Sequence, residues 1–271
     1  MNTGQSVLVI GAGLGGITTA ALLARQGYDV TVLEKNDIPG GRCGQLKRDG
    51  HRFDVGATLF LMPEVFAQTY AALGQEMGDH LDLQRIDPTY NVRFDDGLSL
   101  SLTSDLDAMR SQLEAIEPGS FGGLLRYLDE GRRHYEVSLE QFVGRNFYSW
   151  AEYLNPANLP LLIQLKVLVN HYRNIGRYFD DPRLKAAFTF QNMYLGLSPF
   201  DAPATYSLLQ YTELAEGVWF PKGGLFQVVE SLVAIAQASG VRFEYGTPVK
   251  KIVVEGDRAR GVILPDGRRL N

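Results

Sequence analysis

The chain has 271 residues, 45% of them hydrophobic and 21% charged, a balance that is typical of a folded globular protein and excludes a disordered or collagen-like chain. A formal net charge of −5 at pH 7 argues against a nucleic-acid partner, because such a partner requires a basic surface. Cys43 is the only cysteine, so the chain cannot form an internal disulfide. We therefore expect a protein of the reducing cytoplasm.

The first 33 residues predict one strand–helix–strand unit. Residues 6–10 form a short apolar run typical of a strand buried in a parallel sheet. In residues 14–26 apolar side chains recur at helical spacing, and Gly27 closes the segment as a cap. Residues 28–33 are rich in Val and Thr. We therefore expect a right-handed βαβ unit that opens an α/β fold of the Rossmann type.

A glycine cluster joins the first strand to the helix and contains the G-x-G-x-x-G spacing. In this motif the first glycine permits a tight turn, the second lets a pyrophosphate approach the backbone, and the third lets the helix pack on the strand. Amides at the helix start would then face the phosphates. The predicted dinucleotide site includes Gly11, Ala12, Gly13, Leu14, Gly15 and Gly16.

An acidic residue, Glu34, ends the second strand, as the same motif requires. Its carboxylate would accept a hydrogen bond from a ribose 2′-hydroxyl and would repel a 2′-phosphate, which disfavours NADP. We include the adjacent Lys35 in the predicted site. At this point the sequence leaves FAD and NAD open, and the alternative is a glycine-rich turn beside a solvated glutamate.

A second glycine cluster, Pro-Gly-Gly-Arg-Cys-Gly at residues 39–44, favours FAD. Gly41 lets the main chain run close to a further ligand group, and the Arg42 guanidinium offers fixed donors to oxygen. A simple NAD domain has no use for this cluster.

Farther along, residues 90–94 and 98–102 alternate around Asp-Asp-Gly and predict a hairpin. Ser104 is expected to cap a helix that ends at Pro118-Gly119. Residues 121–214 are mainly helical in pattern. A helix at 223–239 and strands at 241–245, 249–254 and 260–264 follow. The predicted domains are a nucleotide-binding part at 1–85, an inserted and mostly helical substrate-binding domain at 86–215, and a return to the nucleotide-binding domain at 216–271.

The four histidines, His51, His80, His134 and His171, are scattered without a second ligand at metal-binding spacing. We expect no metal centre, and we expect each histidine to lie at the surface or in a cap. No motif identifies a catalytic residue.

With these motifs the chain resembles the flavoprotein superfamily of amine oxidases, protoporphyrinogen oxidases and carotenoid desaturases. The resemblance implies FAD as cofactor, with Glu34 at the adenosine ribose and Arg42 near the pyrophosphate. It also implies that Gly56, Ala57 and Thr58, in Phe-Asp-Val-Gly-Ala-Thr, bring backbone close to the isoalloxazine ring. Val249 matches a valine beside the adenine, although core packing explains Val249 equally well.

Four later segments resemble bacterial-type phytoene desaturases and related carotenoid-oxidising enzymes: residues 178–184, 187–191, 197–204 and 217–224. This resemblance implies FAD-dependent removal of hydrogen from an acyclic C30 or C40 polyene. An amine oxidase-like enzyme and an inactive flavin-binding fragment remain as alternatives. Family members are nearly twice as long, so we expect a missing C-terminal half or a companion chain.

A polyene substrate would require an apolar tunnel and contact with a lipid surface. The candidate membrane contact is residues 159–169, for which the alternative is a buried helix. Several aromatic and apolar residues would line the tunnel unless they are ordinary core: Phe188, Phe190, Met193, Tyr194, Leu195, Phe200, Tyr206, Leu209, Tyr211, Trp219 and Phe220.

Overall fold

The computed structural model describes residues 4–153 and 155–271. The chain divides into two compact units, residues 4–84 with 219–271 (the first unit) and residues 85–218 (the inserted unit). The chain leaves the first unit within β5 (Leu83–Ile86) and returns to it within β8 (Val218–Pro221). The inserted unit extends to Val218, three residues beyond the expected boundary, because the segment around Leu214 packs into its core.

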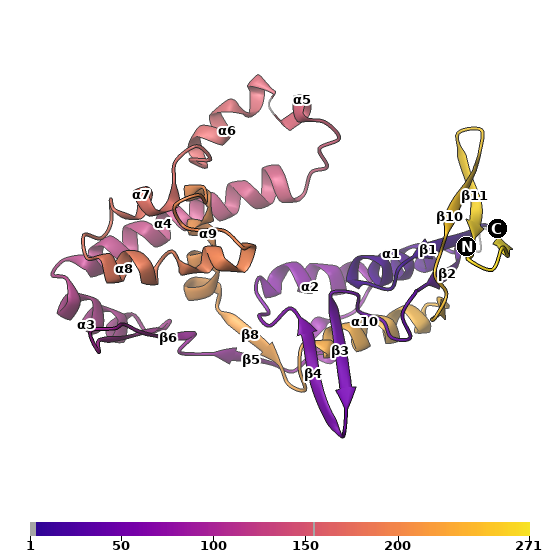
Figure 1. Cartoon of the computed structure of the whole chain (residues 1–271), viewed down its shortest axis with the longest axis horizontal. Coiled ribbons are helices and arrows are strands. Elements are labelled where there is room, and N and C mark those ends of the chain that lie inside the picture. The colour runs from indigo at the N-terminus through magenta and orange to yellow at the C-terminus, as the bar shows by residue number, and fades with distance from the viewer. Residues whose placement is uncertain (1–3, 154) are drawn as a thin grey trace. The chain divides into compact units, whose positions relative to one another are not determined.

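The first unit contains a three-stranded parallel sheet, of which Figure 1 labels β1 and β2. β2 (Asp29–Leu33) pairs with β1 (Ser6–Ile10) on one side and with β9 (Arg242–Glu244) on the other. The helix α1 (Leu14–Arg25) connects β1 to β2, and Gly27 follows it with a φ of +92°. The predicted βαβ unit and its glycine cap are confirmed.

Successive side chains of β2 point to opposite faces of the sheet, and both faces are covered. Val30 and Val32 of β2 point to a core formed with α1 and with α10 (Phe226–Ala238). Leu33 points to the opposite side, where it packs with Val262 and Leu264. Because both faces are covered, β2 is buried from its second residue onward, as the continuous apolar pattern predicts.

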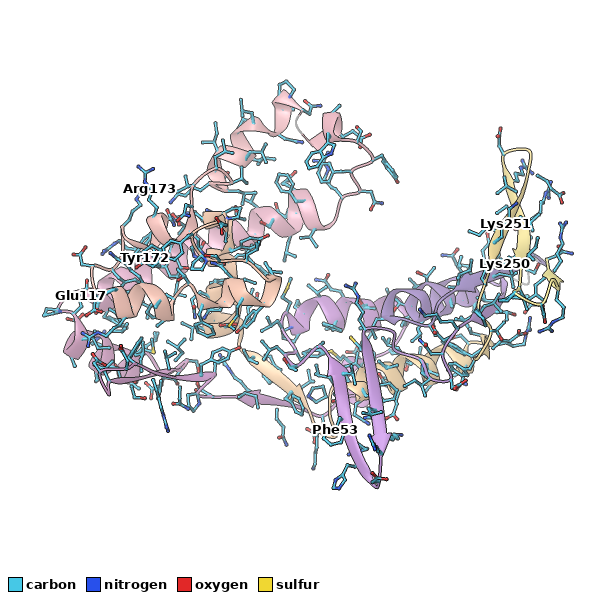
Figure 2. All side chains as sticks on the ribbon, in the orientation of Figure 1. Phe53, Glu117, Tyr172, Arg173, Lys250 and Lys251 are labelled. Atoms are coloured by element: carbon cyan, nitrogen blue, oxygen red, sulfur yellow. The ribbon has the colours of Figure 1, made fainter. Side chains whose placement is uncertain are left out.

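The first unit also has two antiparallel hairpins, one at residues 43–56 and one at residues 251–263. The one that sequence analysis missed joins β3 (Cys43–Arg48) to β4 (His51–Gly56), and Figure 2 labels Phe53 on it. Asp49 and Gly50 both have positive φ angles, of 50° and 78°, at its turn. Asp-Gly at such a turn is a strong hairpin signal that was available in the sequence. The remaining elements of this unit are α2 (Pro63–Ala72), a 3₁₀-helix (Met77–Asp79), β10 (Lys251–Glu255), β11 (Arg258–Ile263) and β12 (Arg269–Leu270).

The inserted unit begins with the predicted hairpin, β6 (Tyr90–Arg93) and β7 (Ser99–Leu102), followed by α3 (Leu106–Ile116). The expectation that Ser104 caps α3 is wrong. The cap is Asp105, whose carboxylate accepts from the amides of Asp107 and Ala108, whereas the Ser104 hydroxyl donates to Asp87. An aspartate at this place satisfies two helix amides at once.

The long helix α4 (Ser120–Ser138) organises the rest of the inserted unit (Figure 1). α9 (Ser207–Tyr211) packs against it at Gly131, where an added Cβ would lie 2.6 Å from the Ser207 carbonyl oxygen. The helical character predicted for residues 121–214 is confirmed for the described part of that range. It comprises π-turns at Leu139–Val143 and Thr212–Glu216, 3₁₀-helices at Pro156–Asn158, Phe190–Leu195 and Ala204–Tyr206, and α5 (Trp150–Tyr153), α6 (Leu159–Gln164), α7 (His171–Ile175) and α8 (Pro182–Ala187).

Candidate functional site

The turn after β1 has the shape that the glycine motif demands. Gly11 adopts a φ of +97°, and its amide donates to the Leu33 carbonyl at 2.8 Å. A Cβ on Gly16 would lie 2.0 Å from the Gly11 carbonyl oxygen, far inside contact distance. Two of the motif glycines are therefore required by the protein's own backbone, before any ligand is considered.

The start of α1 is open in the way an anion site requires. Its N-cap residue is Gly13, which offers no side chain to bond the helix amides. A Cβ on Gly13 or on Gly15 would have nothing within 4 Å. The first amides of a helix lack intrahelical partners and attract negative charge. Since internal packing does not need glycine at these two positions, they fit a close approach by a ligand such as a pyrophosphate.

Glu34 lies at the end of β2 and is only 4% exposed. Its Oε2 accepts from the Ala12 amide at 2.7 Å, and its Oε1 accepts from the Asn36 amide at 2.8 Å. The Glu34 side chain thus ties the glycine turn to the segment that follows β2. A carboxylate has about four acceptor positions, so capacity for a ribose hydroxyl remains after these two bonds. The next residue, Lys35, is exposed.

The second glycine cluster lies directly against the first. Gly40 forms a bridge with Gly13, and its amide donates to the Ala12 carbonyl at 2.7 Å. A Cβ on Gly41 would stand 3.3 Å from the Gly13 Cα. Two segments that are separate in the sequence therefore form one backbone-lined surface, and the exposed Arg42 follows at its edge.

The segment at residues 53–58 joins the same region through main-chain contact. A Cβ on Gly56 would lie 2.0 Å from the Arg42 carbonyl oxygen, so glycine is required there as well. Ala57 and Thr58 are exposed beyond the end of β4. Their predicted proximity to a flavin ring stays a prediction.

Asp54, which carries no local signal in the sequence, links two predicted motifs. Its carboxylate accepts from the Leu225 amide at 2.6 Å and from Gln45 Nε2 at 3.1 Å. A Cβ on Gly224 would stand 2.4 Å from Asp54 Oδ2. The Phe-Asp-Val-Gly and Lys-Gly-Gly segments therefore meet at the start of α10, a long-range pairing that no local pattern reveals.

Val249 packs in the small cluster on the far face of the sheet, with Leu33 and Val262. This position accounts for Val249 by packing, which was one of its two explanations. Contact with an adenine stays a prediction.

The inserted unit contains a buried polar network that corrects the expectation for two histidines. His134 and His171 are both 2% exposed, not at the surface. His171 Nε2 and the Tyr127 hydroxyl are 2.7 Å apart, and burial lowers the pKa of His171 to about 4. His134 Nδ1 lies 2.8 Å from the Ser207 hydroxyl. Each histidine packs between helices that are distant in sequence. Within the described ranges, no three His, Cys, Asp or Glu side chains gather as a metal site.

Glu130 of α4 is the anionic centre of a second buried polar network. Burial raises its pKa, but hydrogen bonds from Lys166, Asn174 and Tyr178 outweigh that effect and hold the pKa of Glu130 below its ordinary value. The Lys166 ammonium also donates to Asn174 Oδ1 at 3.0 Å, and the Tyr178 hydroxyl donates to Glu130 at 2.8 Å. The network stabilises the packing of α4 on α7 rather than forming an open site.

Comparison with known proteins identifies the family. The sequence profile of the flavin-containing amine oxidoreductases matches residues 14–271. The chain belongs to this family. The expected resemblance to flavoproteins and the expected α/β fold are thereby confirmed, and a flavin-containing family supports FAD as the cofactor.

Two relatives of this chain carry a narrower name. The zeta-carotene-forming phytoene desaturase of Myxococcus xanthus is 48% identical over 264 residues, covering 97% of this chain and 51% of that protein. A phytoene desaturase of Cercospora nicotianae is 46% identical over 269 residues, covering 98% of this chain and 43% of that protein. The chain thus spans about half the length of the curated relatives it matches.

A solved structure of putrescine oxidase bound to putrescine superposes with a TM-score of 0.64 at 18% identity, covering 98% of this chain and 56% of that one. At this identity the likeness shows the fold alone.

The residues of this family member fit a flavin dinucleotide. The open helix start, the acid at the end of β2 and the adjoining glycine surface are the features that an adenosine diphosphate group needs. All of them lie in the first unit.

Proposed function

We propose that the chain carries the FAD-binding part of an oxidoreductase that removes hydrogen from an acyclic polyene of the phytoene class. The observation that carries this proposal is the 48% identity across 97% of the chain to a protein named phytoene desaturase. The glycine surface, formed by Gly13, Gly15, Gly40 and Gly41, supports it independently, because its open helix start suits a pyrophosphate.

Each predicted contact has a place in this proposal. The backbone at Gly13 and Gly15 binds the pyrophosphate, and Glu34 accepts from the adenosine ribose. Arg42 lies near the pyrophosphate, and backbone at Gly56 approaches the flavin ring. The other proposed cofactor contacts are Gly11, Ala12, Leu14, Gly16, Lys35, Gly41, Ala57, Thr58 and Val249. Bound FAD would supply the oxidising power, and the protein would bind and orient the substrate and exclude water from it.

A polyene offers no charge to bind, so its affinity must come from buried hydrocarbon, at about 0.8 kcal/mol per buried methylene. The inserted unit holds a groove of about 850 Å³ with a mainly apolar lining, which supports its assignment as the substrate-binding domain. Tyr206, one of the expected tunnel residues, lines this groove. Phe188 does not, since it is fully buried and stacks on Phe179 at 4.9 Å in the core.

Residues 159–169 are proposed as a peripheral membrane contact. Within this segment Leu168 is 97% exposed and Ile163 is 69% exposed, which supports a surface role over a buried helix. Leu159 and Leu162 also line the groove, so the surface that would touch lipid continues into an apolar space. None of the described helices is both long and apolar enough to span a bilayer.

Anaerobic reduction tests the reaction. The purified protein with bound FAD is mixed with phytoene in liposomes, and the flavin absorbance is followed without oxygen. The proposal predicts bleaching by phytoene and none by putrescine. Bleaching by putrescine alone would identify an amine oxidase, and bound flavin that no polyene reduces would leave only the nucleotide-binding part of the proposal.

Liposome flotation tests the membrane contact. The double variant Ile163→Asp, Leu168→Asp is expected to lose most of the binding to vesicles. A matched double variant, Ile252→Asp, Val254→Asp, changes exposed apolar residues of the β10 strand in the first unit and is expected to keep it. Equal binding by both would contradict the assignment of residues 159–169.

A further inference from the structure

A second hollow of the inserted unit, of about 560 Å³, shares part of its wall with the apolar groove. We call it the arginine hollow, and its lining consists of Leu168, Val169, Asn170, Arg173, Asn174 and Arg177. Leu168 and Val169 also line the groove. The two spaces therefore adjoin at this pair of apolar residues.

The arginine hollow carries two positive charges that the protein does not neutralise. Arg173 and Arg177 lie four residues apart and are both exposed, and Figure 2 labels Arg173 on the inserted unit. Across residues 4–153 and 155–271, neither guanidinium has an ion-pair or hydrogen-bond partner. By contrast, Arg132 and Arg133 of α4 are both paired with acids. The two hollow arginines are thus available to an anion from outside the protein.

The other polar groups of the hollow supply no negative charge. Asn170 Oδ1 accepts from the Arg173 amide at 2.9 Å, which leaves Asn170 Nδ2 as a donor without a partner among the described residues. Asn174 is buried and is occupied by Glu130 and Lys166. The Glu130 carboxylate is itself paired with Lys166. The lining therefore offers charge and hydrogen-bond donors to an anion and contains no competing acid.

The wall between the hollow and the groove is fixed by the fold on both sides of Leu168. The Lys166 ammonium donates to Asn174 Oδ1 at 3.0 Å. The Val169 carbonyl accepts from the Ala204 amide at 2.7 Å. Leu168, between these two anchored residues, is 97% exposed. An apolar side chain is thus held in solvent at the edge of the arginine hollow.

We propose that the arginine hollow binds the phosphate of an anionic membrane phospholipid, whose acyl chains lie along Leu168 and Val169. A guanidinium recognises phosphate oxygens through two parallel hydrogen bonds. A ligand with a phosphate head and hydrocarbon chains matches the change from a charged to an apolar lining, whereas a free phosphate matches only the charged part. This inference deepens the membrane contact of residues 159–169 and rests on that part of the proposed function.

A phosphate bound in the hollow would set the depth of the protein in the bilayer. Lipid phosphates lie at the level of the headgroups, so Leu168 would reach from there toward the acyl chains. The groove that begins at the same residue would then open toward the hydrocarbon, where a polyene dissolves. Because the net charge of the chain is −5, an anionic membrane repels the protein as a whole, and attraction depends on local cations.

Flotation of the full chain with two kinds of vesicle tests the site: phosphatidylcholine alone, and phosphatidylcholine mixed with phosphatidylglycerol. The parent protein should bind the mixed vesicles more tightly. Arg173→Gln with Arg177→Gln should lower the partition coefficient on mixed vesicles about 30-fold, since each arginine near an anionic surface contributes about a factor of five. The same variant should change little on phosphatidylcholine, whose choline cancels the phosphate charge.

A matched control removes two other exposed arginines. Arg258→Gln with Arg260→Gln changes β11 of the first unit by the same number of charges. This variant should keep the parent's preference for mixed vesicles. A loss equal to that of the Arg173 and Arg177 variant would overturn the site, because net charge alone would then explain the binding.

Two further measurements identify the ligand. Arg173→Lys with Arg177→Lys keeps both charges without the planar fork, and should bind mixed vesicles less tightly than the parent. Full binding by this lysine variant would overturn a phosphate site in favour of general attraction between charges. Excess glycerol 3-phosphate, which has the phosphate without the chains, should leave vesicle binding unchanged. Displacement by glycerol 3-phosphate would overturn the lipid in favour of a small phosphate ester.

The outcomes separate this site from the proposed function. Equal binding of the parent to both kinds of vesicle, lost in Ile163→Asp, Leu168→Asp, would overturn the phosphate site and keep the membrane contact. Binding that depends on the two arginines but not on Ile163 and Leu168 would overturn both, since the acyl chains would have no apolar wall. None of these measurements uses phytoene, so a failure of desaturation would leave the lipid site standing.

Discussion

Single glycines in the first unit serve two different purposes, and the structure separates them. Gly16 is required by the fold, because a Cβ there would overlap the Gly11 carbonyl oxygen at 2.0 Å. Gly15, one residue earlier, has nothing within 4 Å of an added Cβ. Since the protein makes no use of that open space, we assign it to the cofactor.

Alanine substitutions at these two positions should therefore give opposite results. Gly16→Ala is expected to destabilise the protein without cofactor by about 1–3 kcal/mol, because backbone must move to admit the methyl group. Gly15→Ala should leave that stability within about 0.5 kcal/mol and should weaken FAD binding instead. Urea unfolding of the apoprotein and fluorescence titration with FAD measure the two effects. Equal losses of stability in both variants would contradict this division.

At the residue scale, the sequence identified the positions whose roles are set by local backbone geometry. Gly11 and Gly16 are examples, because a motif of six residues states their constraint. Asp54 escaped notice because its role depends on a partner far along the chain, Leu225. His171 was misjudged for the same reason, since a lone histidine carries no local sign of burial.

The start of α10 is an element whose stability depends on a distant side chain. Asp54 of β4 accepts the Leu225 amide and so serves the place where a helix cap is needed. Asp54→Ala is expected to lower the free energy of unfolding by about 1–2 kcal/mol, because the amide loses its acceptor. The matched control is Asp82→Ala, which removes only a long ion pair with Lys222. Equal effects in urea titrations would contradict the capping role.

Packing of α7 against α4 should depend on pH through His171. Burial places the pKa of His171 at about 4, below its ordinary value of 6.5. The unfolded chain therefore binds more protons than the folded one between these values, so the contribution of neutral His171 is complete above pH 6.5 and is lost as the pH falls toward 4.

Comparison with His171→Gln isolates this effect from that of Glu213, which is the same in both proteins. Burial raises the pKa of Glu213 to about 7, so this group shifts stability in the opposite direction to His171. The difference in unfolding free energy between the parent and the variant should shrink by up to about 3 kcal/mol on acidification from pH 6.5 to pH 4. A constant difference across that range would show that His171 titrates normally.

Elements with strong periodicity were predicted well, whereas the β3–β4 hairpin and the cap of α3 were not. The βαβ unit and the β6–β7 hairpin follow from apolar runs and turn residues. The β3–β4 hairpin was missed although Asp49-Gly50 marks its turn, since Leu46, Phe53 and Val55 are exposed and hide the usual alternation of buried and solvated side chains.

At the scale of the whole chain, an insertion in a nucleotide-binding fold explains the order of its elements. β9 returns from beyond residue 219 to pair with β2, so the first unit cannot close its sheet without the C-terminal segment. The sequence led us to expect an inserted domain from the change in periodicity along the chain. It did not predict which aromatic residues line a cavity, because core and groove residues have the same composition: Phe188 is core and Tyr206 lines the groove.

The central claim is that the glycine surface and Glu34 bind the adenosine diphosphate half of FAD. Competition binding tests it most directly: the purified protein is titrated with FAD, and then with FMN, which lacks that half, and with ADP, which is little else. The account predicts that FAD binds, that ADP displaces it, and that FMN does not replace it. FMN binding as tight as that of FAD, or FAD binding that excess ADP leaves unchanged, would contradict it.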